Sequence, residues 1–425
     1  MKIAFFVDRF PALSETFILN QITGLIDRGH EVDIYADRSD GSTKVHPDVD
    51  KYNLLEKTTY VGKPDHRVWR LLKIAQLPLW NFVKQPAALL QALNVKRYGK
   101  QASSLTLLYS AAHMLGKDRK YDIIQTHFGP NGLEAVFLRE MGVIQGKIAT
   151  QFHGYDLSEY VQRYGREIYR ELFKQGNVFL PISHHMKSRL IELGCDKNRI
   201  NVHHVGVELE RFNFTPRTQP IDGVTQLITI ARFVEKKGLE YGIRAVAALI
   251  KAGINVTYSI VGDGDRRQAL QALIDSLGVG DRIKLLGWKP QPEVIQLLNQ
   301  SHIMLVPSVT SHSGDQEGIP TVLIEAAMLG LPVVSTEHSG IPEVVHHEIS
   351  GFLVPERDVD ALAEQLGYLI QHPELWAEMG RSGRSIVEEQ FDIDRLNTQL
   401  IAIYTDLVHS NLKSTVMLSA SSYAN

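Results

Sequence analysis

Short apolar runs alternate with longer amphipathic segments along most of the chain. In the first half, runs of strand type span Lys2–Val7 and Glu31–Ala36, and segment 15–28 between them has helical periodicity and ends at Gly29. A strand, a helix and a second strand joined by short connections predict a parallel β-sheet. The same pattern predicts further strands at Ile123–Thr126, Lys147–Phe152, Val178–Leu180 and Asn201–His204.

The second half starts this pattern again. A predicted strand at Gln226–Ala231 begins an alternation that continues to about Val354, and residues 206–223 before it lose all periodicity. No fixed repeat is visible, so the sequence predicts an α/β fold of two Rossmann-like, doubly wound parallel-sheet domains rather than a solenoid. We assign the domains to 1–205 and 206–392, with a ligand cleft between them. Further strands are predicted at Ile283–Lys289 and His302–Ser308.

Length and composition fit two domains without disulfides. The 425 residues, 44% of them hydrophobic, suffice for two buried cores, and Cys195 as sole cysteine excludes a disulfide framework or a cysteine-based zinc site. The N-terminus is too short and polar for a signal peptide, and no apolar run approaches the ~20 residues that span a bilayer. We therefore expect a cytoplasmic protein. The Ser- and Ala-rich tail 411–425 is expected to be disordered.

Charge is spread unevenly around a net value of −3. Residues 1–205 carry 28 Lys and Arg against 21 Asp and Glu, whereas residues 206–425 carry 17 against 27. This asymmetry indicates an anionic partner for the first half, and we expect no nucleic acid among the partners.

Segment 63–120 concentrates the positive charge in a predicted helical insertion. It holds eleven Lys and Arg and two acids, interleaved with Trp69, Trp80 and Phe82. Basic amphipathic helices with such aromatic residues are typical of segments that lie on an anionic membrane surface, here the inner face of the membrane. A helical insertion packed on its own domain, with a solvated basic face, explains the pattern equally well. Both interpretations stay open.

The most informative stretch is 308–330. A helix is predicted to begin at Gly318–Pro320, with Glu317 just before it and Glu325 two turns inside. Free N–H groups at a helix start suit a phosphate, and the carboxylates can accept hydrogen bonds from ribose or sugar hydroxyls. Each glutamate alone fits an ordinary helix acid, but Glu325 lies in an apolar run where an unpaired charge is costly. The N–H groups concerned include those of Gly318 and Ile319.

Polar residues also follow predicted strands of the first domain, where doubly wound sheets bind ligands. Ser14 suits a helix N-cap, so the N–H groups near it suit an anion. A histidine at one strand end is usually structural, but two such ends, each followed by glycine within two residues, favour a site. The predicted acceptor or phosphate loops comprise Ser14, Glu15, Thr16, His127 and Asp156, and His153 lies beside them.

Two cations follow the first strand of the second domain. Arg232 comes directly after this strand, and Lys237 opens the next helix although its charge opposes the helix dipole. Together they suit a diphosphate whose negative charge grows as it leaves. Gly262 belongs to VGDGD, a weak half of a dinucleotide fingerprint. At Gly287 and Trp288 another strand ends, where backbone groups suit a base edge.

Several motifs of the second half occur together in one order: Arg232 with Lys237, VGDGD, the Gly287 turn, Glu317 and Glu325 eight residues apart, and GIPEVV…GFLVP at 340–355. This half resembles the C-terminal domain of the retaining family-4 glycosyltransferases (glycosyl transferases group 1), which have the GT-B fold. In the first half, FPALSETFI, HFGPNG and HGYD resemble the bacterial exopolysaccharide branch of the colanic-acid kind. The resemblance covers about residues 1–410.

The resemblance implies roles for individual residues. Glu325 matches the acid that binds the ribose hydroxyls, Glu317 the acid beside the transferred sugar, and His153 the histidine near the anomeric region. Arg232 and Lys237 match the pair on the diphosphate, so no metal and no cofactor are implied. A last helix at about 393–410 is implied to cross back onto the first domain. Many relatives have a Gly-Gly pair where this chain has Leu13–Thr16, which leaves the role of that loop in donor or acceptor binding open.

The sequence therefore predicts an enzyme that moves a hexosyl unit from a UDP- or GDP-linked sugar to a glycan or lipid-linked glycan acceptor, with retention, in exopolysaccharide or surface-glycan biosynthesis. One alternative is a nucleotide-sugar epimerase of the same fold, which would turn over the donor without an acceptor. The other is a non-catalytic nucleotide-binding protein that uses VGDGD.

Overall fold

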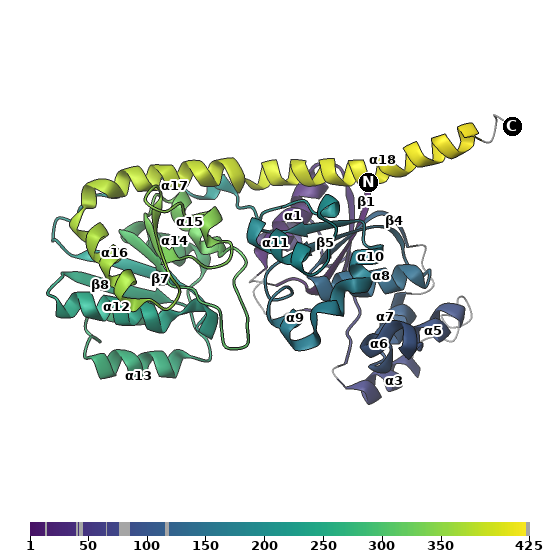
Figure 1. Ribbon diagram of the computed structural model, residues 1–425, viewed down its shortest axis with the longest axis horizontal. Helices are drawn as coiled ribbons and strands as arrows, with labels where there is room; N and C mark the ends of the chain where they lie inside the picture. Colours follow the sequence, from purple (N-terminus) through teal and green to yellow (C-terminus); the bar gives the residue numbers. More distant parts are fainter. Residues whose placement is uncertain are drawn as a thin grey trace.

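The computed structural model describes residues 1–12, 15–39, 41, 46–64, 66–75, 86–114 and 119–421, without the side chains of Arg67 and residues 410–421. Two α/β domains lie side by side along the longest axis, and the helices α17 (Trp376–Gln390) and α18 (Ile393–Ser421) follow one another across them (Figure 1). Each domain contains a six-stranded sheet, and the recorded strand pairs are parallel. The predicted pair of doubly wound sheets is confirmed.

The N-terminal sheet has the strand order β3-β2-β1-β4-β5-β6. Successive strands are added on one side of β1 as far as β3 and then on its other side from β4 onward, and such sheets bind ligands at this switch point between β1 and β4. Its strands are β1 (Lys2–Arg9), β2 (Glu31–Arg38), β3 (Thr58–Tyr60), β4 (Lys120–His127), β5 (Gln145–Phe152) and β6 (Val178–Pro181). The helices around it are α1 (Thr16–Asp27), α2 (Pro47–Lys51), α8 (Gly129–Glu140), α9 (Glu159–Tyr164), α10 (Arg170–Gln175) and α11 (His184–Glu192).

The C-terminal sheet has the order β12-β11-β10-β7-β8-β9, which is the same topology. Its strands are β7 (Thr225–Ile230), β8 (Val256–Val261), β9 (Ile283–Gly287), β10 (Ile303–Val306), β11 (Val333–Thr336) and β12 (Gly351–Val354). Its helices are α12 (Leu239–Lys251), α13 (Arg267–Leu277), α14 (Gln291–Gln300), α15 (Thr321–Met328), α16 (Val359–Gln371) and α17 (Trp376–Gln390). Strands such as β10 and β12 are buried along their whole length because helices cover both faces, which is why they read as short apolar runs.

Two strand predictions were wrong at the edges of the first sheet. Asn201–His204 is not a strand, although the N–H groups of Asn201 and His203 donate to the carbonyls of Phe179 and Pro181 over 3.0 and 2.9 Å. These bonds run along the edge of β6 without forming a ladder. The edge strand β3 was not predicted because its three residues lack an apolar face.

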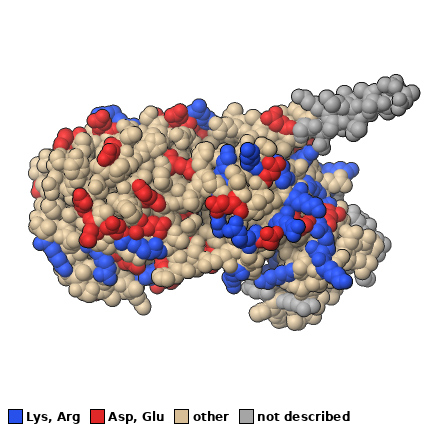
Figure 2. Space-filling view, in the orientation of Figure 1, with Lys and Arg blue, Asp and Glu red and all other residues tan. Residues whose placement is uncertain are grey.

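The basic segment between β3 and β4 folds as helices α3 (Arg67–Ala75), α5 (Pro86–Ala92), α6 (Val95–Ser103) and α7 (Thr106–Met114). Lys and Arg gather on the N-terminal domain on the face shown in Figure 2. Several of these charges hold the insertion to its own domain and so do not form a free basic face. Trp80, Phe82, Lys84 and Lys117 fall outside the described residues.

The internal contacts of these basic residues are short. Lys63 Nζ lies 2.8 Å from Glu134 Oε2, and the Arg70 guanidinium donates to the carbonyls of Pro64 and Ser104, each over 2.7 Å. Arg97 forms ion pairs with Glu140 and Glu171 at 2.8 and 2.7 Å. The interpretation of the segment as a packed insertion therefore accounts for Lys63, Arg70 and Arg97.

The last helix, α18 (Ile393–Ser421), leaves the C-terminal domain and lies on the N-terminal one (Figure 1). Leu400 and Tyr404 are fully buried in the same core as Ile3 and Phe5 of β1. The helix continues through residues 411–421, where disorder was predicted, because the sequence from 393 to 421 contains no Gly or Pro to end it. Across the described residues, no helix has both the length and the apolar character that a bilayer crossing requires.

Candidate active site

Residues at the carboxyl ends of the C-terminal strands form one side of the candidate site. Arg232 follows β7, Gly262 follows β8, Trp288 follows β9, and the loop after β10 leads to Glu317. Parallel strands end at the same edge of a sheet, so these positions are brought together as the strand pattern predicted.

Glu317 is the most tightly held charge at this edge. It is buried, and its Oε2 accepts from Lys237 Nζ over 2.9 Å, while Lys236 Nζ lies 3.9 Å from Oε1. Burial alone would raise the pKa of Glu317, but the two ammonium groups outweigh it and hold the pKa below its ordinary value. Glu317 is therefore a carboxylate, and its Oε1 has no hydrogen-bond partner among the described residues.

The prediction that Lys237 opens a helix was wrong, because α12 begins at Leu239. Lys236 Nζ pairs with Asp315 at 2.9 Å and donates to the Gln316 carbonyl over 3.2 Å. Lys236 and Lys237 form a short 3₁₀ turn, Glu235–Lys237, ahead of α12. Their charges are neutralised by the loop after β10 and not by the helix.

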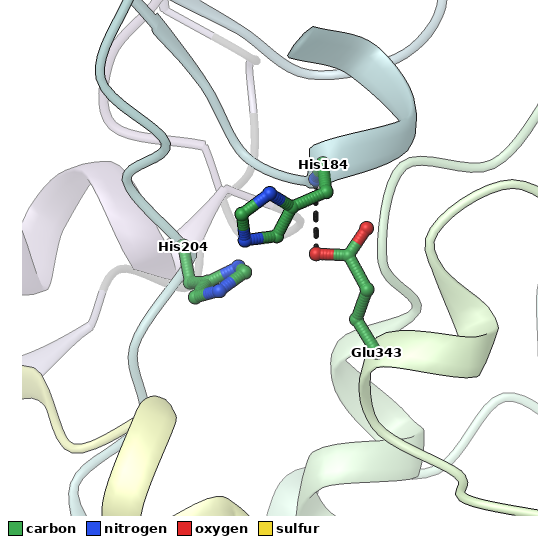
Figure 3. A group of neighbouring side chains, drawn as sticks. All are labelled: His184, His204 and Glu343. Atoms are coloured by element: carbon green, nitrogen blue, oxygen red, sulfur yellow. Dashed lines mark hydrogen bonds between the residues drawn. The ribbon is translucent and has the colours of Figure 1, made fainter. Parts of the chain in front are cut away.

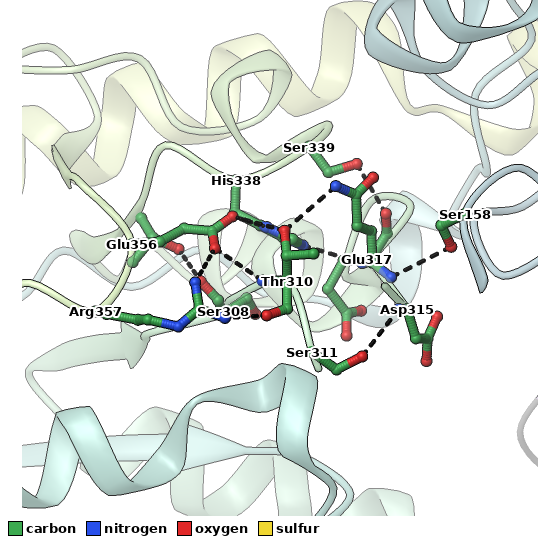
Figure 4. A network of polar contacts seen from close by, with 12 residues as sticks. Ser158, Ser308, Thr310, Ser311, Asp315, Glu317, His338, Ser339, Glu356 and Arg357 are labelled. Atoms are coloured by element: carbon green, nitrogen blue, oxygen red, sulfur yellow. Dashed lines mark hydrogen bonds and ion pairs between the residues drawn. The ribbon is translucent and has the colours of Figure 1, made fainter. Parts of the chain in front are cut away.

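A polar network shapes this loop (Figure 4). Glu356 accepts from the backbone N–H and the hydroxyl of Thr310, over 2.8 and 3.1 Å, and pairs with His338. His338 Nε2 in turn accepts from the Glu317 N–H over 3.0 Å. His338 and Glu356 were not predicted as site residues, although they follow β11 and β12 by two residues each, as Arg232 follows β7.

Glu325 has no such partner. Helix α15 begins at Thr321 rather than at Gly318–Pro320, and Pro320 occupies its N-cap position. Glu325 lies half-buried in the second turn and makes no hydrogen bond or ion pair with the residues that the structure describes. Burial raises the pKa of Glu325 to about 7. Gly318 and Ile319 lie in the non-helical segment just before the helix, between the two glutamates.

Arg232 is exposed. Its guanidinium makes no hydrogen bond or ion pair within the described parts of the chain. Gly262 has φ +135°, and a Cβ there would lie 1.8 Å from the Ala231 carbonyl, so only glycine lets these two strand ends approach. Trp288 is 58% exposed beside Gly287, whose carbonyl accepts from the Gly262 N–H over 2.9 Å.

The N-terminal domain contributes His153 from the end of β5. His153 Nε2 lies 3.0 Å from Nδ1 of His127, which is fully buried at the end of β4. The Phe17 and Phe128 rings lie 4.8 and 4.7 Å from the His153 ring. Burial lowers the pKa of His153 to about 3, so the ring is neutral.

Asp156 is not positioned to contact a ligand. It is fully buried, and its two carboxylate oxygens accept from the backbone N–H groups of Gly129, His153 and Gly154 over 2.9 to 3.0 Å. Asp156 thereby ties the loops after β4 and β5 together, which corrects its prediction as a loop ligand.

The loop after β1 also differs from the prediction. Glu15, not Ser14, occupies the N-cap position of α1, its side chain does not cap the helix, and Thr16 is the first helical residue. Ser14 falls outside the described residues, so its anion-binding role stays a prediction.

The two domains touch at glycines. A Cβ on Gly318 would lie 2.4 Å from the His153 carbonyl, and one on Gly154 would lie 3.1 Å from the Gly318 nitrogen. This contact brings His153 next to Glu317. Beside it, a cavity of about 660 Å³ opens between α9, α11 and the loop after β10. None of the predicted site residues lines this cavity, whose walls include Ser158, Arg166, Arg189, Thr310 and Gln316.

A second contact between the domains involves His184, His204 and Glu343 (Figure 3). Their potential ligand atoms lie within 4.8 Å of one another. Both Glu343 oxygens already accept from the backbone N–H groups of His184 and His185, over 2.9 and 3.2 Å. Glu343 therefore caps the start of α11 across the domain boundary.

The matches with known proteins cover most of the chain. Residues 14–211 match the model of Glycosyltransferase Family 4, and residues 212–386 match that of Glycosyl transferases group 1. WcaL of Escherichia coli K12, named for colanic acid biosynthesis, is 40% identical over 407 residues, covering 95% of this chain and 99% of its own. The amylovoran biosynthesis glycosyltransferase AmsK of Erwinia amylovora is 40% identical over 401 residues, covering 92% and 96%.

Solved structures show the same architecture. Anabaena HepE in complex with UDP and glucose aligns with a TM-score of 0.68 and 16% identity, covering 96% of this chain and all of its own. The fold is GT-B. Taken together with the identity to WcaL and AmsK over nearly their full lengths, the matches establish that the chain belongs to the family-4 glycosyltransferases and is a retaining hexosyltransferase.

Proposed function

We propose that the protein transfers a hexosyl unit from a UDP- or GDP-linked sugar to a glycan or lipid-linked glycan acceptor in exopolysaccharide biosynthesis. The names of WcaL and AmsK support the pathway class, and the UDP and glucose in HepE support the donor class. We assign donor binding to residues 206–392 and acceptor binding to residues 1–205.

The observation that carries the proposal is the pair of glutamates on either side of the α15 start. Glu317 Oε1 is buried without a hydrogen-bond partner, and Glu325 has no partner within the described chain. Buried acceptors left unpaired are costly, which supports a ligand rich in hydroxyl donors. A nucleotide sugar offers such donors at two places, on its ribose and on its hexose, with a diphosphate between them.

The proposed reaction needs no carboxylate nucleophile. Glu325 binds the ribose and Glu317 the hexose, while Arg232 and Lys237 stabilise the diphosphate as the bond from the anomeric carbon to its phosphate oxygen breaks. The acceptor hydroxyl attacks from the face that the phosphate leaves, and its proton passes to a phosphate oxygen. Retention follows because attack and departure share one face. The cavity between the domains, which Arg166 and Arg189 line, gives room for the acceptor.

A membrane surface is the proposed source of a lipid-linked acceptor. Helices α3 and α5 expose large apolar side chains, among them Trp69 at 60%, Val68 at 66% and Leu90 at 71%. Lys73 and Lys96 are exposed on the same insertion. Exposed apolar groups beside cations support a peripheral position on the inner face of the membrane. Arg70 and Arg97 are left out of this surface because their guanidinium groups are bound internally.

A donor panel tests the proposal. Purified protein is incubated with UDP- and GDP-linked hexoses, with and without a lipid-linked glycan, and products are analysed by mass spectrometry and by NMR for anomeric configuration. We expect transfer only with acceptor present, with retention, and at least a hundredfold loss for Glu317→Gln, on the scale of a lost charged contact in the transition state. The exposed Glu364→Gln is the matched control. Donor conversion without acceptor would indicate an epimerase instead.

A further inference from the structure

A continuous chain of buried hydrogen bonds runs from His153 through the core of the N-terminal domain. His153 Nε2 lies 3.0 Å from His127 Nδ1, and His127 Nε2 lies 3.0 Å from Gln21 Oε1. Gln21 Nε2 donates to Gln151 Oε1 over 3.2 Å. The Gln151 oxygen also accepts from Gln125 Nε2 over 3.4 Å, and Gln125 Oε1 accepts from the Tyr404 hydroxyl of α18 over 2.8 Å.

One backbone carbonyl determines which partner donates in each hydrogen bond of this network. Gln151 Nε2 donates to the His203 carbonyl over 3.5 Å, and a carbonyl can only accept. Turning the Gln151 amide around would bring two buried acceptor oxygens face to face. Gln151 therefore presents its oxygen to Gln21, and Gln21 must offer its nitrogen there.

The orientations of the two amides determine which nitrogen of each histidine ring carries the proton. With its nitrogen on Gln151, Gln21 presents its oxygen to His127, so His127 Nε2 carries the proton and donates. His127 Nδ1 is then an acceptor, and His153 must donate to it from Nε2. His153 Nδ1 is left as a lone pair, with no protein partner among the described residues. Neutrality of the His153 ring fits this assignment, because burial lowers its pKa to about 3.

We propose that Gln151, Gln21 and His127 act as positioning residues that fix His153 in the Nε2–H tautomer. His153 Nδ1 then faces the donor sugar as a hydrogen-bond acceptor. This inference rests on the proposed transfer function and adds a substrate class to it. The His153 backbone meets Gly318, the residue after Glu317, at the domain contact. An acceptor nitrogen on the His153 ring binds a hydroxyl, which can donate, and repels a carboxylate, which cannot. The site therefore selects neutral hexosyl donors over hexuronosyl donors.

The first test does not depend on activity. Long-range ¹H–¹⁵N correlation spectra of histidine-labelled protein distinguish the two tautomers of each ring. We expect Nε2–H at His127 and His153 between pH 6 and 8. Gln21→Leu removes the acceptor from His127 and should yield a mixture of tautomers at His153, whereas Gln371→Leu, on an exposed residue of α16, should leave the spectra unchanged. An Nδ1–H tautomer at His153 in the unaltered protein overturns the proposal.

The second test measures selectivity. The unaltered enzyme should use a neutral hexose donor at least tenfold better, in kcat/KM, than the hexuronate donor with the same nucleotide, and Gln21→Leu should reduce that ratio. Two changes are then combined: the sugar hydroxyl that donates to His153 is removed from the donor, and Gln21 is replaced by Leu. Together they should lower kcat/KM by a smaller factor than the product of their separate factors, because both act through one contact. Full additivity with every deoxygenated donor contradicts the proposal. Absence of transfer from all donors contradicts the proposed function instead, and the spectra still report the tautomer.

Discussion

The raised pKa of Glu325 makes donor binding depend on pH. Burial without a cationic partner raises this pKa to about 7, so the side chain is protonated below pH 7 and a carboxylate above it. Ribose hydroxyls that donate to Glu325 would favour the carboxylate and return its pKa toward the ordinary value. Nucleotide affinity should therefore rise with pH.

The size of this effect follows from proton linkage. If the bound form stays ionised, the fraction of free enzyme ready to bind grows from about one tenth at pH 6 to about nine tenths at pH 8, which is an approximately tenfold gain in affinity. At pH 7 binding should release about half a proton. Glu325→Gln should bind about 1.5–3 kcal/mol more weakly than the ionised enzyme, the scale of a hydrogen bond to a charged group.

Isothermal titration calorimetry with UDP and GDP measures all three quantities. Titrations at pH 6, 7 and 8, each in two buffers of different ionisation enthalpy, give the affinity and the number of protons released. Glu325→Gln should show weak binding without pH dependence, and Glu364→Gln should behave like the unaltered protein. Equal affinity at pH 6 and 8, or proton uptake at pH 7, would refute the ribose assignment.

Further predictions concern charge, folding, closure and the membrane. Lys237→Met should lower kcat more than it raises the donor KM. It should also move the acidic limb of the kcat profile to higher pH, because Glu317 loses its nearest cation while Glu325 stays ionised in the donor complex, whereas Arg232→Ala should lower kcat without moving that limb. Lys63→Met should cost about 3–5 kcal/mol in urea unfolding, because Glu134 is left buried and unpaired, and a second change, Glu134→Gln, should recover part of the loss. Gly318→Ala should lower kcat/KM, because the added Cβ forces the domains apart at the His153 carbonyl. Steady-state kinetics and small-angle scattering can check this, and Gly280→Ala is the control because a Cβ there meets nothing closer than 3.8 Å. Trp69→Ser with Leu72→Ser should abolish flotation with anionic vesicles while leaving nucleotide affinity unchanged; if the unaltered protein fails to float at low salt, the membrane interpretation is wrong.

The sequence was sufficient to predict site residues that lie at the carboxyl ends of parallel strands, where such sheets bind ligands. Apolar runs located most strands, and their carboxyl ends located Arg232 and His153 without any knowledge of distances. The same rule should have singled out His338 and Glu356. Both were missed because the strands before them, β11 and β12, were not located individually in the sequence.

Contacts between distant segments were beyond prediction. The loops after β4 and β5 are joined by Asp156, which looked like a ligand because its sequence neighbours do not reveal that three backbone N–H groups converge on it. Tyr404 meets Gln125 across 279 residues, and nothing in the local pattern of either indicates the other. Basic residues such as Arg97 were equally ambiguous, because a count of charges cannot show which acids they meet.

The position of α18 has a consequence for how the protein is made. The ribosome completes residues 1–205 first, yet Leu400 and Tyr404, which fill the core beside β1, emerge about two hundred residues later. Until then the N-terminal domain exposes apolar surface, and Gln125 lacks its hydroxyl donor. Domains usually fold as they emerge, but this one is completed only after Leu400 and Tyr404 have emerged. A nascent chain that stalls in the second domain therefore exposes an unfinished first domain to aggregation and to chaperones.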